Sequence, residues 1–497
     1  MNSAFPHPVY SQHVLQPAYR EAQQDLFTHM LAAHEAHAVM LAECNIITRE
    51  NARAICAAVA EIQAAGPGAF AYQPGVEDLF FRIESAIMER VGPEWGGNLQ
   101  LARSRNDLGH ALFRMALRQA LLQAEEKLLA LRQAVHAQAL EHAETLMPGY
   151  THTQPAQPTT FGHYLAGVLA FLAKDQARFA AAYANMNESP LGAAAFTGTG
   201  FPIDRERVAA LLGFDRVIAS TQHAIGAGDH LTDAAFAVQS LAVGLTRVTK
   251  DLLFLATQES GALRIHDSFI QISSIMPQKR NPVVLEHLRA RLSRAMGYAQ
   301  TVILQCHSIP YGDTQDIEDE IMPPLLLALE TLGACLDLYT AVFQSLSLNK
   351  PHLARRAGEG FTTATELADA LVREAGLPFR VAHSIVSRAV NASLAEETAA
   401  ETGRPHLTLE AVQTAAQAVL GRPLHLSQAQ FQRAVDPAHF VAARQGLGGA
   451  APEATRALLA QQAAEIRTDQ EDLAGRHNRL AAAEDTRRAA IAALHME

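Results

Sequence analysis

The feature that most constrains the fold of this chain is a segment of 40 residues, 107–146, that contains no proline and a single glycine. It is rich in Ala, Leu, Gln, Glu and Arg, and its apolar residues recur at helical spacing. A single helix of this length would extend roughly 60 Å, at about 1.5 Å per residue. Such a helix needs neighbours packed along its whole length to bury its apolar side chains.

Three further segments have the same character, at residues 159–187, 230–257 and 282–306. Strong helix formers dominate all three, and the chain has no run of alternating β-branched residues that would indicate a sheet. The sequence therefore predicts an all-α fold built on a central bundle of long helices. The bundle is expected to be flanked by smaller helical N- and C-terminal domains.

Domain boundaries are predicted where the helical pattern changes. Residues 1–107 indicate an N-terminal helical domain, and residues 108–350 indicate the central bundle of long helices. Residues 351–497 contain shorter helical segments separated by glycine and proline pairs, which predicts a C-terminal helical domain.

The longest apolar stretch, residues 324–343, carries Glu330 and Asp337 in its interior. Charges at those places cost too much free energy for an ordinary membrane span. The stretch is therefore predicted to be a buried helix of the bundle, and no membrane partner is expected.

Charge and cysteine usage narrow the class of protein. Forty Lys and Arg side chains oppose 51 Asp and Glu side chains, giving a net charge of −11, which argues against nucleic acid as the main partner. Cys44, Cys56, Cys306 and Cys335 have no metal-binding or disulfide spacing, which indicates a reducing compartment. The first 30 residues lack the apolar core of a secretory signal. A cytoplasmic location is expected.

The most specific local pattern is the polar segment Ser273–Pro282, which reads SSIMPQKRNP and precedes a long helical segment. Its cation, Lys279, lies close to the amides of Gln278 and Asn281 and to two serine hydroxyls. These groups suit a loop that closes over a dicarboxylate and offers a hydroxyl for proton transfer. On residue types alone, a proline-bounded helix entry with a solvated lysine is the favoured interpretation.

Three motifs give the chain a resemblance to a known family. The segment Ser273–Pro282 is similar to the signature of the fumarase/aspartase superfamily, whose members eliminate fumarate from succinyl compounds. Arg103–Asp107 (RSRND) and Met147–Pro158 (MPGYTHTQPAQP) resemble two motifs of the argininosuccinate lyases within it. Weaker matches continue to the end of the chain, so the resemblance covers nearly all of it.

The resemblance implies a carbon–nitrogen lyase that eliminates fumarate from an N-substituted aspartate, with argininosuccinate as the first candidate substrate and arginine as the amine product. It also implies a homotetramer whose active sites are each composed of loops from three subunits. Elimination requires no redox or acyl-transfer step, so neither a cofactor nor a metal is expected.

The resemblance also implies residue roles. Ser274, the second serine of its pair, is the base, and Lys279 with nearby backbone N–H groups stabilises its alkoxide. His152 is the proton-transfer partner, and Glu286 orients it. Alone, His152 is equally compatible with an ordinary loop histidine, and Arg105 with a surface salt bridge. The residues expected to bind substrate are Ser104, Arg105, Asn106, Thr151, Ser273, Met276, Gln278, Asn281 and Tyr311.

Departures from the family pattern concentrate in the half of the site that holds the amine. The family places a tyrosine, then a glutamine and a lysine, in the segment at residues 309–323, and this chain has Tyr311 followed by Glu318 and Ile321. The family's Asp-Arg-Asp stretch corresponds to Gly228-Asp229-His230. Glycine usually precedes the serine pair, where this chain has Ile272.

These departures leave alternatives open. A paralogue acting on another N-succinyl amine or aminocarboxylate, such as ethylenediamine disuccinate, is the main one. A catalytically silent, crystallin-like scaffold and a fumarase- or adenylosuccinate-lyase-type enzyme are the others, and the retained motifs weigh against both.

Overall fold

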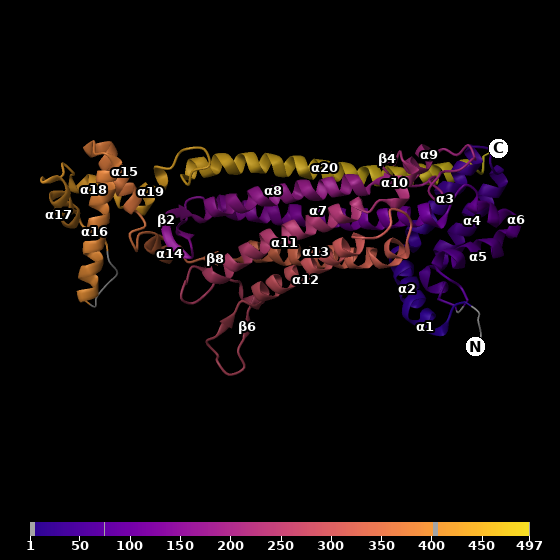
Figure 1. The fold of residues 1–497 in the computed structure, drawn as a ribbon, viewed down its shortest axis with the longest axis horizontal. Helices are drawn as coiled ribbons and strands as arrows, with labels where there is room; N and C mark the ends of the chain where they lie inside the picture. Colours follow the sequence, from indigo (N-terminus) through magenta and orange to yellow (C-terminus); the bar gives the residue numbers. More distant parts are fainter. Residues whose placement is uncertain (1–4, 74, 401–405, 497) are drawn as a thin grey trace.

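The computed structural model describes residues 5–73, 75–400 and 406–496, without the side chains of residues 318 and 396–400. Helix α7 (Arg105–Glu141) is the central helix of the fold. Helices α8 (Phe161–Met186) and α13 (Met322–Ser345) pack directly against it, and α11 (Asp229–Leu255) and α12 (Val283–Cys306) complete the bundle by packing against those two helices and each other. Figure 1 shows them running side by side along the long axis of the molecule. The predicted all-α fold with a central bundle of long helices is confirmed.

The start of α7 is fixed by a capping box. The Ser104 side chain accepts a hydrogen bond from the N–H of Asn106, and Asp107 Oδ1 accepts one from the Ser104 N–H at 2.9 Å. These bonds satisfy backbone donors that would otherwise be unpaired at the helix N-terminus. They also set the orientation of the first helical turn, which carries Arg105 and Asn106.

Helix α13 contains the apolar stretch, and among the described helices it is the one long and apolar enough to cross a membrane. It packs against α7 and α12, with one face of its side chains buried. Asp337 forms an ion pair with Lys127 of α7 at 2.6 Å. The predicted buried bundle helix is confirmed.

The segment Met147–Pro158, whose prolines and glycine indicate a loop between two long helices, is instead part of a β-hairpin. Strand β1 (Leu146–Thr151) pairs antiparallel with β2 (Gln154–Thr160), and Thr151 is opposite Gln154. His152 and Thr153 form the two-residue turn with φ of 51° and 63°. A turn with two positive φ values matches the twist of the strands, which explains how a proline-rich segment can pair.

Smaller groups of helices cover both ends of the bundle. The N-terminal helices share one continuous apolar core with the bundle, whereas α15 to α18 have a separate core. Helix α20 (Pro452–Ala493) returns along α7 and α8, so both chain ends lie at the same end of the molecule in Figure 1. Residues from 452 onward thus pack with the bundle, although the sequence pattern grouped them with the C-terminal domain.

The remaining elements complete the described chain. They are α1 (Pro8–Tyr10), α2 (Gln16–Asp25), α3 (Phe27–Glu43), α4 (Arg49–Ala65), α5 (Leu79–Val91), α6 (Pro93–Gly96), β3 (Glu188–Ser189), α9 (Arg205–Leu211), β4 (Arg216–Val217), α10 (Thr221–Gly226), β5 (Leu263–Arg264), β6 (Gln271–Ile272), β7 (Arg280–Asn281), η5 (Asp316–Glu320), β8 (Ser347–Leu348), α14 (Lys350–Ala357), α15 (Ala364–Ala375), α16 (Phe379–Ala400), α17 (Leu409–Leu420), α18 (Gln428–Ala434) and α19 (Pro437–Ala442).

Substituting Gly162→Ala tests the packing of α8 on α7. A Cβ at Gly162 would lie 2.5 Å from the Ala139 carbonyl oxygen and 2.6 Å from the Ala143 Cα, so the helices must separate. The expected cost is about 1–3 kcal/mol of stability, measured as a lower Tm. Gly167→Ala, on the same helix with open space around it, is the matched control and should stabilise by about 0.5–1 kcal/mol. Equal Tm values for the two variants would contradict this packing.

Candidate active site

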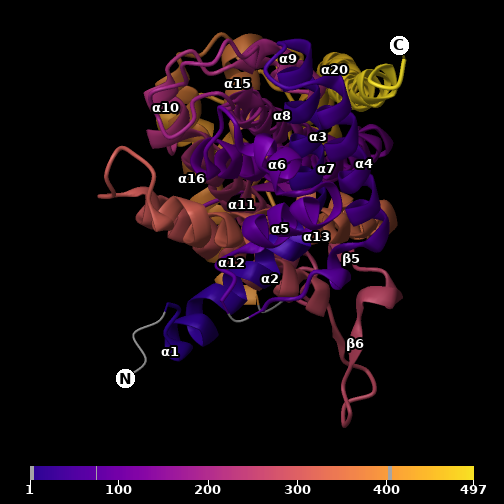
Figure 2. The same cartoon turned by 90° about the vertical axis from the view of Figure 1, so that its right-hand side faces the viewer.

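The segment Ser273–Lys279 forms the tip of an arm that projects from the bundle. Strands β6 and β7 pair antiparallel at its base, and Figures 1 and 2 show the arm extending away from the helices. Ser273 Oγ accepts a hydrogen bond from the Met276 N–H at 3.1 Å, which stabilises the turn. Ser274 is exposed, and Ile272 and Ile275 are 77% and 83% exposed. Apolar side chains this open are typical of an interaction surface.

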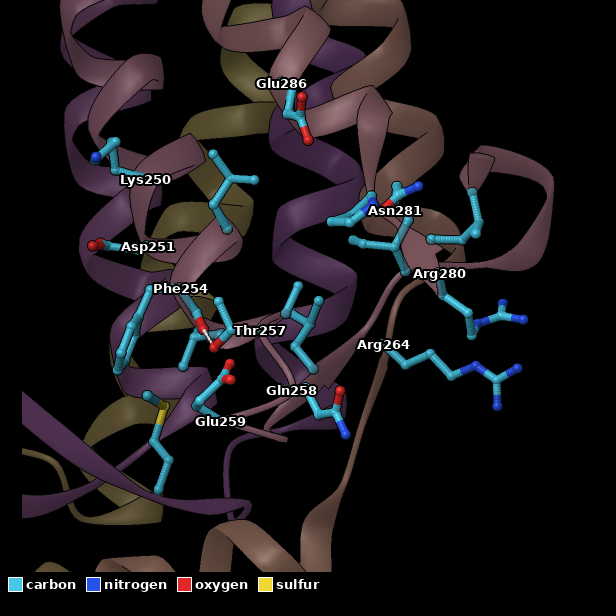
Figure 3. A pocket seen from close by; sticks show the side chains of 18 of the residues that line it. Lys250, Asp251, Phe254, Thr257, Gln258, Glu259, Arg264, Arg280, Asn281 and Glu286 are labelled. Carbon is cyan, nitrogen blue, oxygen red and sulfur yellow. Dashed lines mark hydrogen bonds between the residues drawn. The ribbon is translucent and has the colours of Figure 1, made fainter. Parts of the chain in front are cut away.

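The arm borders a cavity of about 1440 Å³ that also reaches the end of α11 and the hairpin. In Figure 3, Asn281 of β7 and Glu286 of α12 lie around the same space as Thr257 and Gln258, which follow α11. The structure therefore brings together most of the residues predicted on the arm. Met276, Gln278, Lys279 and Asn281 of the arm line the cavity together with Glu286 of α12, whereas Ser273 and the predicted base Ser274 do not line it.

The turn of the hairpin presents His152 and Thr151 to solvent. Both side chains are exposed, and His152 has a left-handed backbone conformation that is uncommon for a residue other than glycine. Within the described part of one chain, His152 and Glu286 form no ion pair with each other. The predicted His152–Glu286 pair is thus not present inside a single subunit.

A second group of predicted residues lies at the start of α7. Arg105 Nη1 is 2.6 Å from Asp78 Oδ2, Arg105 Nη2 is 3.3 Å from Glu77 Oε1, and its guanidinium lies over the Phe81 ring. Burial raises the pKa of Asp78, and its hydrogen bond from the Phe81 N–H and the charge of Arg105 oppose that rise. Arg105 is therefore held in place by acidic side chains that a substrate carboxylate would have to displace.

Asp107 organises the segment beside this group. Its Oδ2 accepts hydrogen bonds from the N–H groups of Gly192 and Ala194 at 2.9 and 3.0 Å, and its side chain is fully buried. Asn106 Nδ2 donates to the Ala195 carbonyl oxygen at 3.5 Å. Asp107 was not among the predicted site residues, although the spacing of Ser104 and Asp107 is that of a capping box and could have identified it.

Tyr311 belongs to this second group. Its hydroxyl is 2.7 Å from Nδ1 of His223 on α10, and two residues later Asp313 Oδ1 is 3.5 Å from Nε2 of the buried His110 on α7. His110 and His223 were not predicted. No local pattern marks His223, because it lies 88 residues from Tyr311 in the sequence.

The two groups of predicted residues lie at opposite ends of the bundle. Ser104 caps one end of α7, and the hairpin with His152 follows the other end. With 37 residues, α7 is about 55 Å long at about 1.5 Å per residue. Figure 1 shows the N-terminal helices and the hairpin at the two ends of the helical bundle. One chain therefore cannot bring both groups to the same substrate.

The segment that departs from the family pattern forms part of the second group. Ile321 is fully buried, and the Glu318 side chain lies outside the described residues. Burial raises the pKa of Asp319 to about 6, with additional repulsion from Glu320 and Asp78, while Arg105 lowers it. Acidic rather than basic side chains therefore dominate the described part of this segment.

Metal ligands are not grouped in the described parts of the chain. No three His, Cys, Asp or Glu side chains among residues 5–73, 75–400 and 406–496 are arranged to hold a metal ion. All four cysteines are free.

Sequence comparison identifies the class. The family model described as Lyase matches residues 11–297, more than half of the chain, and the one described as Argininosuccinate lyase C-terminal matches residues 361–442. With the long-helix bundle and the projecting arm, these matches define a carbon–nitrogen lyase of the fumarase/aspartase superfamily.

The argininosuccinate lyase of Halobacterium salinarum is 42% identical over 437 residues, 88% of this chain and 86% of that protein. Argininosuccinate lyase 2 of Agrobacterium fabrum is 38% identical over 92% of this chain and 90% of its own length. The chain belongs to the argininosuccinate lyase family.

Solved structures agree on the fold. An EDDS lyase variant with bound fumarate superposes with a TM-score of 0.87 at 32% identity, covering 99% of this chain and 96% of that chain. A class II fumarase from Schistosoma mansoni shares the fold at 16% identity with a TM-score of 0.68, covering 87% and 92% of the two chains.

The raised pKa of Asp319 predicts that the stability of the folded protein depends on pH at this residue. A carboxyl group whose pKa is higher in the folded than in the unfolded chain destabilises the fold when the pH exceeds its pKa in the unfolded chain. The full destabilisation is reached above about pH 6, the pKa of Asp319 in the folded chain. Asp319→Asn should therefore raise the Tm at pH 8, by about 1–2 °C after allowance for solvent screening of a partly exposed group. The gain should shrink at pH 5. A Tm difference that is the same at both pH values, or a lower Tm at pH 8, would show that Asp319 titrates normally.

Proposed function

We propose that this protein eliminates fumarate from an N-substituted aspartate by breaking a carbon–nitrogen bond, with argininosuccinate as the first candidate substrate. The observation that carries the proposal is the projecting arm, which places Ser274 on the same short loop as Lys279 and Asn281. The relatives named argininosuccinate lyase support the choice of substrate.

The chemistry assigns each group a role. Ser274 removes the proton from the carbon adjacent to one carboxylate, and the electron pair moves into that carboxylate, where Lys279 and Asn281 stabilise the added charge. The electron pair then forms the double bond of fumarate as the bond to nitrogen breaks, and His152, oriented by Glu286, supplies a proton to the leaving amine. Thr151, Ser104, Arg105 and Asn106 hold the succinyl carboxylates. Atoms and electrons balance without an oxidant or metal.

We propose a homotetramer with sites shared between subunits. Its main support is the length of α7, which keeps Arg105 and His152 of one chain apart. Exposed apolar side chains on α11 and α12 add to it, because unpaired helix faces of this kind require a partner. They are Phe236, Val243, Met296 and Leu304.

The four free cysteines suit the reducing cytoplasm, where we place the protein.

The second candidate substrate is an aminocarboxylate such as ethylenediamine disuccinate. Two observations favour it: the buried Ile321 where the family has a lysine, and the similarity to EDDS lyase over almost the whole chain. Both candidates share the fumarate-forming half of the reaction and differ in the amine.

Ser274→Ala tests the base. Fumarate release from argininosuccinate, followed by ultraviolet absorbance, should fall by about 10²–10⁴-fold because a general base is lost. Ser268→Ala, just before the arm, is the control and should keep wild-type activity. An unchanged rate in Ser274→Ala would exclude Ser274 as the base. If the wild type releases fumarate only from aminocarboxylates, the second candidate holds, and release from neither would indicate a silent scaffold.

Subunit mixing tests the shared sites. Arg105→Ala and Ser274→Ala should each be inactive alone, because each removes one essential segment from every site. In randomly mixed tetramers, about a quarter of the sites receive the Arg105 segment from a Ser274→Ala chain and the Ser274 segment from an Arg105→Ala chain, so both segments are intact and these sites should be active. Co-expressed, differently tagged chains allow the mixed species to be purified and assayed. If one chain built each site by itself, the mixture would remain inactive.

A further inference from the structure

The hydroxyl of Tyr311 is engaged by a histidine that lies outside the family motifs. Tyr311 Oη is 2.7 Å from His223 Nδ1, while the side chain of Tyr311 remains 61% exposed. The hydroxyl is therefore bound on one side and open on the other. What it can offer a substrate depends on whether it donates or accepts the bond with His223.

Helix α10 fixes the rest of Tyr311 as well. Gln222 Nε2 donates a hydrogen bond to the Tyr311 carbonyl oxygen at 3.3 Å. Gly226 lies so close that a Cβ there would be 3.0 Å from the carbonyl carbon and Cδ1 of Tyr311. The backbone, the ring and the hydroxyl of Tyr311 are thus all positioned by one short helix.

Asp229 determines which nitrogen of His223 carries the proton. Asp229 Oδ2 lies 3.9 Å from His223 Nε2. The ring of His230, whose Nδ1 is 3.9 Å from Asp229 Oδ1, and a hydrogen bond from Asn185 hold the pKa of Asp229 well below its usual range, so this carboxylate is charged at neutral pH. A charged carboxylate on that side favours a proton at Nε2, which leaves Nδ1 as an acceptor. Tyr311 then donates its proton to His223, and its own lone pairs accept hydrogen bonds from a ligand.

The charged groups near Tyr311 also favour a positively charged ligand. Asn185 bridges the carboxylates of Asp229 and Asp233, and Asp313 lies two residues along the chain. The fully buried Arg114 is bound to the Asn185 carbonyl oxygen at 2.8 Å and to the ring of His230 at 3.1 Å. A carboxylate arriving here would meet acidic groups, and an ammonium group would be attracted.

We propose that Tyr311, positioned by His223 and Asp229, accepts a hydrogen bond from an ammonium group at the far end of the leaving amine. The site therefore selects amines by a distal ammonium group and not by a distal carboxylate. This inference rests on the proposed function and specifies the class of amine that this function uses.

Addition of amines to fumarate provides the test. Agmatine keeps the guanidinium and the ammonium of arginine without the carboxylate, and 5-guanidinopentanoate keeps the carboxylate without the ammonium. Loss of fumarate absorbance should give agmatine a kcat/KM within about threefold of that for arginine, and 5-guanidinopentanoate at least about tenfold lower, the effect of one charge-assisted hydrogen bond. A preference for 5-guanidinopentanoate over agmatine would overturn the inference.

Variants separate positioning from a general structural role. Tyr311→Phe and His223→Leu should each raise the KM for agmatine about tenfold, with kcat and the KM for fumarate changed less than about threefold. The KM for 5-guanidinopentanoate should not change. His223→Asn, which can keep an acceptor near the Nδ1 position, should restore most of the affinity for agmatine. Equal losses for both amines in all variants would overturn the role of His223.

The same comparison distinguishes this inference from the proposed function. If no guanidine reacts, 1,4-diaminobutane and 4-aminobutanoate form an equivalent pair without a guanidinium, and a preference for the diamine supports the inference. A reaction that favours 4-aminobutanoate overturns the inference and leaves the lyase function standing. No fumarate consumption with any amine, in the wild type as in Ser274→Ala, overturns the proposed function and this inference with it.

Discussion

The length of α7 is the constraint on which the rest of the structure depends. A helix of 37 residues separates the Arg105 group from the hairpin turn with His152, and it is rigid because α8, α13 and α20 pack along it. No loop movement closes a separation of this size. We therefore propose that the chemistry draws on more than one copy of the chain, with the exposed apolar faces of α11 and α12 as the association surfaces.

Buried polar side chains fix the backbone at the start of α7. Asp107 is fully buried and links the start of α7 to the backbone at Gly192 and Ala194. His110 reaches Asp313 from the next turn of the same helix. A buried carboxylate that accepts several N–H bonds holds neighbouring backbone more precisely than apolar packing does. The start of α7 is therefore a preformed half-site, whereas the arm with Ser274 is open.

Sequence reasoning predicted the long helices because their periodicity is local and extends over many turns. It predicted the arm residues and the RSRND group because both are contiguous motifs. It did not predict the β-hairpin, because prolines conceal strand pairing, and it did not find His223, whose partner Tyr311 is distant in sequence. The paired carboxylates at Arg105 also come from another element, and only the folded chain shows them.

The amine half of the site differs in character from the fumarate half. The arm groups a cation with amides and hydroxyls, whereas Asp313 follows Tyr311 in the chain and Asp229 lies 3.9 Å from its partner His223. Under the proposed function, this division allows one part of the chain to keep the elimination chemistry while another determines which amine leaves.

The most direct test is a crystal structure of the assembled protein with bound fumarate. Density for fumarate should show contacts to Ser274 and Lys279 of one chain, Thr151 of a second and Asn106 of a third. Fumarate held entirely by residues of one chain would contradict the shared site and the role assigned to the length of α7.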